Sequence, residues 1–161
     1  MNNLGTIFYN YDAIDITVHI NSTLFNDSEY LNSGVESLVY DKGDYVYKVK
    51  KDGYISDEDL EKQKHRIINK NKIEIFLEEE LVGYLTHLLE PSVKHLVTKQ
   101  KKVSVQKDCT EIVQQLIKNN WIPTVSQYEK DNYVIYDIRP DNCGIDEDGN
   151  FKIIDCVSYT K

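Results

Sequence analysis

The chain has 161 residues, a formal net charge of -8 at pH 7 and a pI near 5.0. This length suits one domain with a single hydrophobic core. The acidic balance excludes a protein that coats nucleic acid or an anionic membrane, because both functions need a broad basic surface.

Cysteine usage and the N-terminal stretch indicate the compartment. The three cysteines, Cys109, Cys143 and Cys156, are odd in number and lack the spacing of a disulfide framework or a C-x-x-C zinc pair. The first residues, MNNLGTIFYNYDAID, carry neither a basic flank nor a long apolar run, so they do not resemble a secretory signal. We therefore expect a cytoplasmic protein with reduced thiols.

The first third of the chain has the patterns of strands. Residues 1–33 alternate apolar and polar side chains in pieces such as TIFYNY and DITVHI, which predicts strands with one buried face. In GVESLVYDKGDYVYKVKK, two β-branched and aromatic runs flank the turn-forming segment Asp41–Asp44. This arrangement predicts an antiparallel hairpin.

A helix and further strands are expected next. Ser56 and Asp59 have the spacing of a capping box, which predicts a helix from about Asp57 to about Asn69. Between Ile73 and Val105 the pattern is ambiguous, because EEELVGYLTHLLE fits either a strand or a helix. We favour strands over IEIFL, this segment and HLVTK, with a break at Pro91.

The last third combines one helical pattern with short strand-like runs. Asp108 and Glu111 repeat the capping spacing before four apolar residues on one helical face, Ile112, Val113, Leu116 and Ile117. The runs YVIY, CGID and FKII predict strands, and a turn containing Gly149 joins the last two. Together the patterns predict an α+β fold.

The segment DIRPDNCGIDEDGNFKIID resembles the catalytic loop, hairpin and metal-binding aspartate of protein kinases. As in kinases, an asparagine, Asn142, lies five residues after an aspartate, Asp137, and a hairpin then leads to Asp155. Over Gly34 to Asp155, the segments GVESLVYDKGDYVYKV, LVTKQ and IYDIRPDNCGIDEDGNFKIID resemble the kinase domains of polyvalent proteins from phages and mobile elements.

The resemblance implies a fold and a set of ligands. The fold is a minimal kinase-like domain over residues 1–161, with an antiparallel-sheet N-lobe at about 1–100 and a strongly truncated C-lobe at about 101–161. Only six residues follow Asp155, so we expect neither an activation segment nor a peptide-docking lobe. The implied ligands are ATP and Mg²⁺, and the implied partners are a nucleotide and a protein substrate or binding partner.

The resemblance also implies a role for each site residue. Asp137 would orient or deprotonate the acceptor hydroxyl, and Lys48 and Arg139 would neutralise phosphates. The metal ligands would be Asn142 and Asp155. The glycine-rich loop over the phosphates would begin at Gly34, and Lys48 would pair with Glu61, or alternatively with Glu58, on the first helix.

Departures from the kinase pattern leave alternatives open. Ile135 and Tyr136 replace the His and Arg of the HRD motif, and Cys156 and Val157 replace the Phe and Gly of DFG. The function that the resemblance implies first is an ATP- and Mg²⁺-dependent phosphotransferase. These changes motivate the alternative of a pseudokinase, meaning a nucleotide-binding or protein-interaction module without catalysis. A small α+β binding protein without a nucleotide site is a third hypothesis, because RPDN and DEDGN also fit ordinary caps and turns.

We expect the charged runs Glu78–Glu80 and Lys99–Lys102 to be solvated surface.

Overall fold

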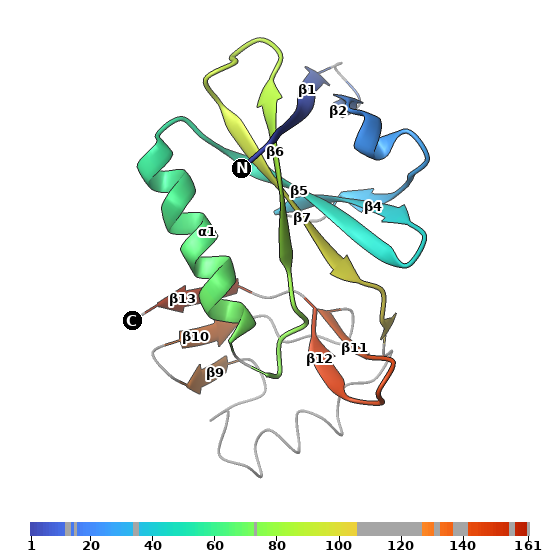
Figure 1. Cartoon of the computed structure of the whole chain (residues 1–161), viewed down its shortest axis with the longest axis vertical. Helices are drawn as coiled ribbons and strands as arrows, with labels where there is room; N and C mark the ends of the chain where they lie inside the picture. Colours follow the sequence, from blue (N-terminus) through green and yellow to red (C-terminus); the bar gives the residue numbers. More distant parts are fainter. Residues whose placement is uncertain are drawn as a thin grey trace. The chain divides into compact units, whose positions relative to one another are not determined.

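The structure is a computed structural model and describes residues 1–11, 14, 16–33, 36–72, 74–105, 127–130, 133–136, 142–154 and 157–160. These residues form strands, one α-helix and one short 3-10 helix (Figure 1), which confirms the predicted α+β class. The chain divides into two compact units. The first comprises residues 1–72 and 78–101, and the second comprises residues 73–77 and 102–161.

The first unit is built on a seven-stranded curled sheet with the order β2-β1-β6-β7-β5-β4-β3. Neighbouring strands are antiparallel except for β1 and β6, which are parallel. The strands are β1 (Asn3–Tyr11), β2 (Ile16–Asn21), β3 (Glu29–Ser33), β4 (Ser37–Lys42), β5 (Tyr45–Tyr54), β6 (Glu80–His87) and β7 (Lys94–Lys101).

The hairpin of β4 and β5 confirms the prediction from its turn. Gly43 lies in the turn with a φ of 69°, a conformation that glycine adopts without the steric cost of a Cβ. The register pairs Leu38 with Val49 and Val39 with Lys48. Because paired residues of antiparallel strands point to the same face, Leu38 and Val49 lie on one face and Lys48 on the other.

One face of the sheet carries the main apolar core. The 3-10 helix η1 (Thr23–Phe25) contributes the Phe25 side chain to this core. The core members share near-complete burial and are Ile7, Phe25, Leu38, Val49, Leu85 and Val97. Alternation along β5 and β7 therefore directs their intervening residues, Lys48 and Thr98, to the opposite face.

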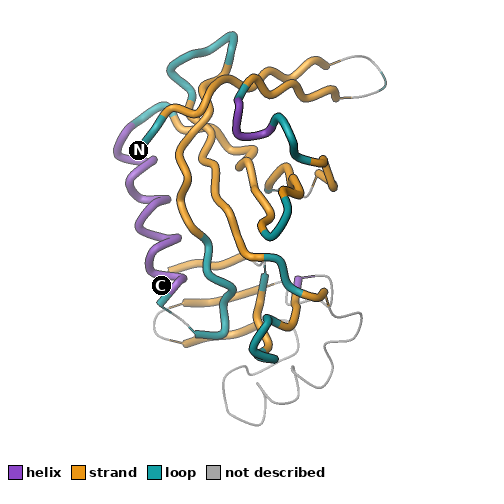
Figure 2. Tube along the Cα trace, turned by 45° about the vertical axis from the view of Figure 1, so that its right-hand side comes forward, coloured by secondary structure: helices purple, strands orange, loops and turns teal. Residues whose placement is uncertain are grey.

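Helix α1 (Asp57–Asn71) packs on that opposite face. Its N-terminus confirms the predicted cap, because the Ser56 hydroxyl accepts a hydrogen bond of 3.0 Å from the Asp59 backbone N–H. Leu60 and Ile67 of the helix form a second core cluster with Leu96 of β7. The helix lies along one side of the sheet in both the cartoon and the Cα tube (Figure 1, Figure 2).

The second unit contains two three-stranded sheets. One consists of β8 (Ser104–Val105), β11 (Cys143–Ile145) and β12 (Phe151–Ile153), and the other of β9 (Gln127–Lys130), β10 (Tyr133–Tyr136) and β13 (Val157–Thr160). The strand prediction for IEIFL is wrong over its described residues. Its pairing is limited to an isolated parallel bridge between Phe76 and Ile153, in which Ile153 accepts a hydrogen bond from the Leu77 N–H and donates one to the Ile75 carbonyl.

The helix predicted from the cap at Asp108 up to the break at Asn119, Asn120 and Pro123 lies outside the described residues. Within the described ranges, no helix has both the length and the apolar character needed to cross a membrane.

Candidate functional site

Lys48 occupies a buried position on the helix-covered face of the sheet. It pairs with Val39 of β4 and with Thr98 of β7, and only 4% of its surface is exposed. Lysine is almost never fully buried unless an anionic group compensates its charge. Its surroundings therefore decide what this side chain can do.

A buried carboxylate, that of Glu79, lies beside these strands. Glu79 immediately precedes β6 and is 1% exposed. Its Oε1 lies 2.9 Å from Nζ of Lys50 and accepts a 2.5 Å hydrogen bond from the Thr98 hydroxyl, and its Oε2 lies 3.0 Å from Nζ of Lys70. We call Lys48, Lys50, Lys70, Glu79 and Thr98 the Glu79 cluster.

The main chain of Glu79 is fixed as firmly as its side chain. The Asn71 amide donates to the Glu79 carbonyl at 2.9 Å, and its Oδ1 accepts from the Glu79 backbone N–H at 3.0 Å. Asn71 and Lys70 belong to the last turn of α1. The end of the helix therefore holds Glu79 against the sheet through both backbone and side-chain contacts.

The electrostatics of the cluster keep Glu79 ionised. Burial is the largest influence and by itself raises the pKa of this carboxyl. Four neighbouring groups together outweigh burial and hold the pKa well below its usual value, namely the ammonium groups of Lys70, Lys50 and Lys48 and the hydroxyl of Thr98. The cluster is thus a buried carboxylate surrounded by three cations, one of which is Lys48.

The polar character of this face extends beyond the cluster. Ser37 of β4, paired with Lys50, is 4% exposed, and Gln100 of β7 is 2% exposed. The expectation that Glu78–Glu80 and Lys99–Lys102 are wholly solvated is therefore wrong for Glu79 and Gln100. Both residues sit on strands or strand ends whose alternation turns them inward.

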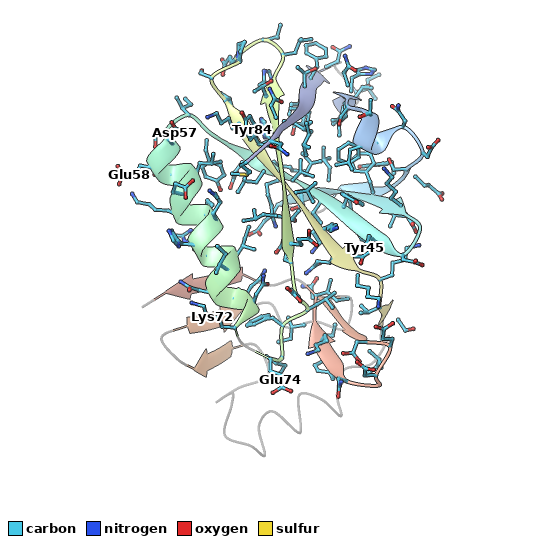
Figure 3. All side chains as sticks on the ribbon, in the orientation of Figure 1. Tyr45, Asp57, Glu58, Lys72, Glu74 and Tyr84 are labelled. Atoms are coloured by element: carbon cyan, nitrogen blue, oxygen red, sulfur yellow. The ribbon has the colours of Figure 1, made fainter. Side chains whose placement is uncertain are left out.

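The structure places the expected helix partners of Lys48 in solvent. Glu61 has a 55% exposed side chain and forms an ion pair of 2.5 Å with Lys64. Glu58 is 79% exposed, pairs with Lys62, and lies on the outer side of α1 (Figure 3). Glu79, unlike these two helix residues, is a buried carboxylate, and the Lys48 ammonium is one of the charges that lower its pKa.

A sequence signal for Glu79 does exist. It lies between Leu77 and Leu81, so a period of two places it on the same side of an extended segment as two apolar residues. Two explanations fit a carboxylate in such a position. Either the period of two does not hold and the residue is on the surface, or the residue is buried and has cationic partners. The choice depends on lysines from β5 and α1, which are distant in the sequence.

In the second unit, Asn142 lies next to the end of the β11–β12 hairpin. Its backbone carbonyl accepts a 2.7 Å hydrogen bond from the backbone N–H of Ile154. Asp155 follows Ile154 in the chain but lies outside the described residues. The hairpin thus brings one expected metal ligand beside the residue that precedes the other.

The remaining expected site residues lie in parts of the chain that the structure does not describe. They are Gly34, Asp137 and Arg139. Among the described residues, no group of three or more His, Cys, Asp or Glu side chains is arranged to hold a metal ion.

The acidic turn of the hairpin has a structural explanation of its own. Oδ1 of Asp146 accepts hydrogen bonds from the backbone N–H groups of Asn150 at 2.8 Å and Asp148 at 3.0 Å. These bonds, led by the one from Asn150, lower the pKa of Asp146. With Gly149 at a φ of 79°, the segment is an ordinary turn, as one of the sequence hypotheses expected for DEDGN.

No protein-family model, curated protein or solved structure matches the chain.

Proposed function

We propose that the chain is an ATP- and Mg²⁺-dependent phosphotransferase of the kinase-like type, with Lys48 as a phosphate-binding cation. One observation carries this proposal: Lys48 is buried on a central strand and its ammonium acts on the ionised Glu79. A lysine on a strand, placed by a carboxylate, is the arrangement with which kinases bind the α and β phosphates.

The burial of Lys48 supports a phosphate-binding role on physical grounds. An ammonium group acts on phosphate as a compact point charge, and its interaction strengthens where water is excluded. Phosphoryl transfer depends on such positioned charges more than on covalent chemistry by the protein. Glu79 would restrict where the Lys48 ammonium sits, so that less ordering is needed when the phosphate binds.

The hairpin of the second unit supports the metal-binding part of the proposal. The hydrogen bond between Asn142 and Ile154 brings Asn142 beside the residue that precedes Asp155. The amide oxygen of Asn142 and the carboxylate of Asp155 would be the metal ligands. Such oxygen ligands fit Mg²⁺, which when bound would neutralise charge on the transferring phosphate. Asp137 would orient the acceptor hydroxyl, and Arg139 would contact the phosphate.

A pseudokinase is the second candidate, and β10 carries the observation that favours it. Ile135 and Tyr136 are the residues before Asp137, and they lie in this strand opposite Ser158 and Val157 of β13. Neither side chain can replace the histidine that supports the kinase aspartate. A protein of this kind would bind nucleotide through Lys48 and act through a partner.

A transfer assay on four matched proteins tests the proposal. Wild type, Lys48→Met, Asp137→Asn and the control Lys62→Met are incubated with γ-labelled ATP, Mg²⁺ and either host lysate or small hydroxyl acceptors. Lys62 is a suitable control because its side chain is 60% exposed on α1. We expect labelled product from wild type and Lys62→Met, and its loss from the other two variants.

Nucleotide binding separates the two candidates. Thermal unfolding with ATP and Mg²⁺ should show stabilisation of wild type by about 2.7 kcal/mol at a hundredfold excess over Kd. Stabilisation without any transfer would support the pseudokinase. The absence of both transfer and stabilisation would rule out a nucleotide site altogether.

A further inference from the structure

Ser37 is a buried polar residue on the same face as the Glu79 cluster. It is 4% exposed, and its hydroxyl has no hydrogen-bond partner within the described part of the chain. A buried hydroxyl without a partner destabilises a fold, and such groups in native structures call for an explanation. A ligand that accepts a hydrogen bond from this hydroxyl would supply one.

The register of the sheet places Ser37 beside a lysine. Ser37 of β4 pairs directly with Lys50 of β5, so the two side chains are cross-strand neighbours on one face. The next pair on this face is Val39 with Lys48. Ser37, Lys50 and Lys48 therefore form a short row that combines a hydroxyl donor with two ammonium groups.

Lys50 is able to serve a ligand as well as Glu79. Its ammonium has three N–H donors, and the ion pair with Oε1 of Glu79 uses one of them. Its side chain is 21% exposed, whereas that of Glu79 is 1% exposed. Solvent, and hence an incoming anion, can reach part of the Lys50 side chain.

We infer that Ser37 and Lys50 form a phosphate-binding position beside Lys48, so that this face of the sheet binds a polyphosphate chain through side chains of β4 and β5. The class of ligand follows from the donors. A hydroxyl and an ammonium together suit a phosphate oxygen. The inference rests on the proposed function for the identity of the biological ligand, a nucleotide. Binding at Ser37 and Lys50 itself requires neither the nucleobase nor phosphoryl transfer.

Binding of inorganic tripolyphosphate tests the inference without a nucleotide. Calorimetric titrations compare wild type with Ser37→Ala and Lys50→Gln, and with the controls Ser92→Ala and Lys62→Gln, which alter exposed residues. We expect each site variant to weaken binding about tenfold, as expected for a lost hydrogen bond to a charged group. The controls should bind as wild type does.

Stability measurements distinguish a binding role from a packing role. Because the Ser37 hydroxyl has no protein partner within the described residues, Ser37→Ala should unfold at the same urea concentration as wild type, or a higher one, without ligand. With tripolyphosphate, it should gain less stability than wild type. Failure of wild type to bind tripolyphosphate, or unchanged affinity in both site variants, would overturn the inference.

The outcomes also separate this inference from the proposed function. Tripolyphosphate binding that depends on Ser37 and Lys50, without labelled product from ATP, would uphold the binding position and reject the phosphotransferase. Transfer that is unaffected by both variants would uphold the phosphotransferase and reject the position. ATP serves as the second titrant, because equal losses for ATP and tripolyphosphate would locate the contact on the phosphate chain.

Discussion

Nζ of Lys50 lies 2.9 Å from Oε1 of Glu79, a carboxylate of which only 1% is exposed. This ion pair joins β5 to the segment that precedes β6. A second pair, from Lys70, joins the same carboxylate to the end of α1. Glu79 therefore links the end of α1, β5 and, through the Thr98 hydroxyl, β7, in addition to the apolar contacts of Leu60 and Ile67 with Leu96.

Replacing Glu79 by Gln should destabilise the protein strongly. The variant keeps the size of the side chain but leaves buried ammonium groups without this carboxylate. Breaking a buried pair in this way typically costs about 3–5 kcal/mol. Urea unfolding followed by circular dichroism measures the loss as a lower midpoint.

The adjacent residue provides the control for Glu79→Gln. Glu80 has a 62% exposed side chain and pairs with Lys99 at 3.2 Å. Exposed pairs contribute about 0–1 kcal/mol, so Glu80→Gln should leave the midpoint nearly unchanged. Equal losses in the two variants would show that the burial of Glu79 does not matter to stability.

Acid should remove the contribution of Glu79. Its pKa in the folded protein is well below the value of 4.5 for an ordinary glutamate, so the unfolded chain binds a proton first as the pH falls. The contribution of ionised Glu79 to the free energy of unfolding is fully present above about pH 4.5 and is lost progressively below it. The difference in unfolding free energy between wild type and Glu79→Gln, measured from pH 7 to pH 3, should therefore shrink as the pH falls through this range. A constant difference would contradict the low pKa.

A second pH effect is expected from His95 of β7. The ring is 4% exposed, and its Nδ1 lies 3.0 Å from the Lys50 carbonyl, which assigns the proton to Nδ1. Burial foremost, with a smaller contribution from His87, lowers the pKa of His95 below the ordinary value of 6.5. The folded state therefore favours the neutral ring.

Stability should accordingly fall as the pH drops below about 6.5, because the unfolded chain takes up a proton that the folded chain resists. The expected measurement is a slope in the unfolding free energy between pH 7 and pH 5. His95→Gln should flatten this slope, whereas His19→Gln, a change at an exposed residue of β2, should retain it. A slope that survives in His95→Gln would assign the effect to another group.

Local signals in the sequence are enough to predict the hairpin and the helix. Gly43 marks the turn between β4 and β5, and Ser56 caps α1, so neither prediction needs knowledge of distant residues. The alternation of apolar and polar residues around Lys48 likewise predicts that it lies on a strand. Its burial on the helix-covered face is beyond the local pattern, because it depends on the cover supplied by α1 and β7.

The identity of the buried carboxylate near Lys48 cannot be predicted from local sequence patterns. The resemblance to kinases points to Glu61 because kinases place this carboxylate in the helix, yet the helical pattern of charges keeps Glu61 on the exposed face with Lys64. Glu79 comes from the segment after the helix, in a run of three glutamates that is typical of surface. The convergence of Lys48, Lys50, Lys70 and Thr98 compensates its burial, and that convergence is a tertiary property.

Gly5 of β1 should not tolerate a larger residue. Its φ of 139° is unfavourable for any residue with a Cβ, and a Cβ at this position would lie 2.0 Å from the carbonyl oxygen of Asn21. It also follows the irregularity at which the register between β1 and β6 shifts. Gly5→Ala should therefore force β1 and β2 apart.

Gly43→Ala is the matched comparison for Gly5→Ala. Gly43 also has a positive φ, 69°, but apart from the residues next to it in the chain no atom lies within 4 Å of the point that an alanine Cβ would occupy, so only backbone strain of about 1 kcal/mol is expected. Gly5→Ala combines a collision with backbone atoms and a φ that is less favourable than that of Gly43, so its urea midpoint should fall much further. Equal midpoints would mean that the β1–β2 pair can move without loss, and hydrogen exchange of the Thr6 and Ile20 amides would then show the same protection in both variants.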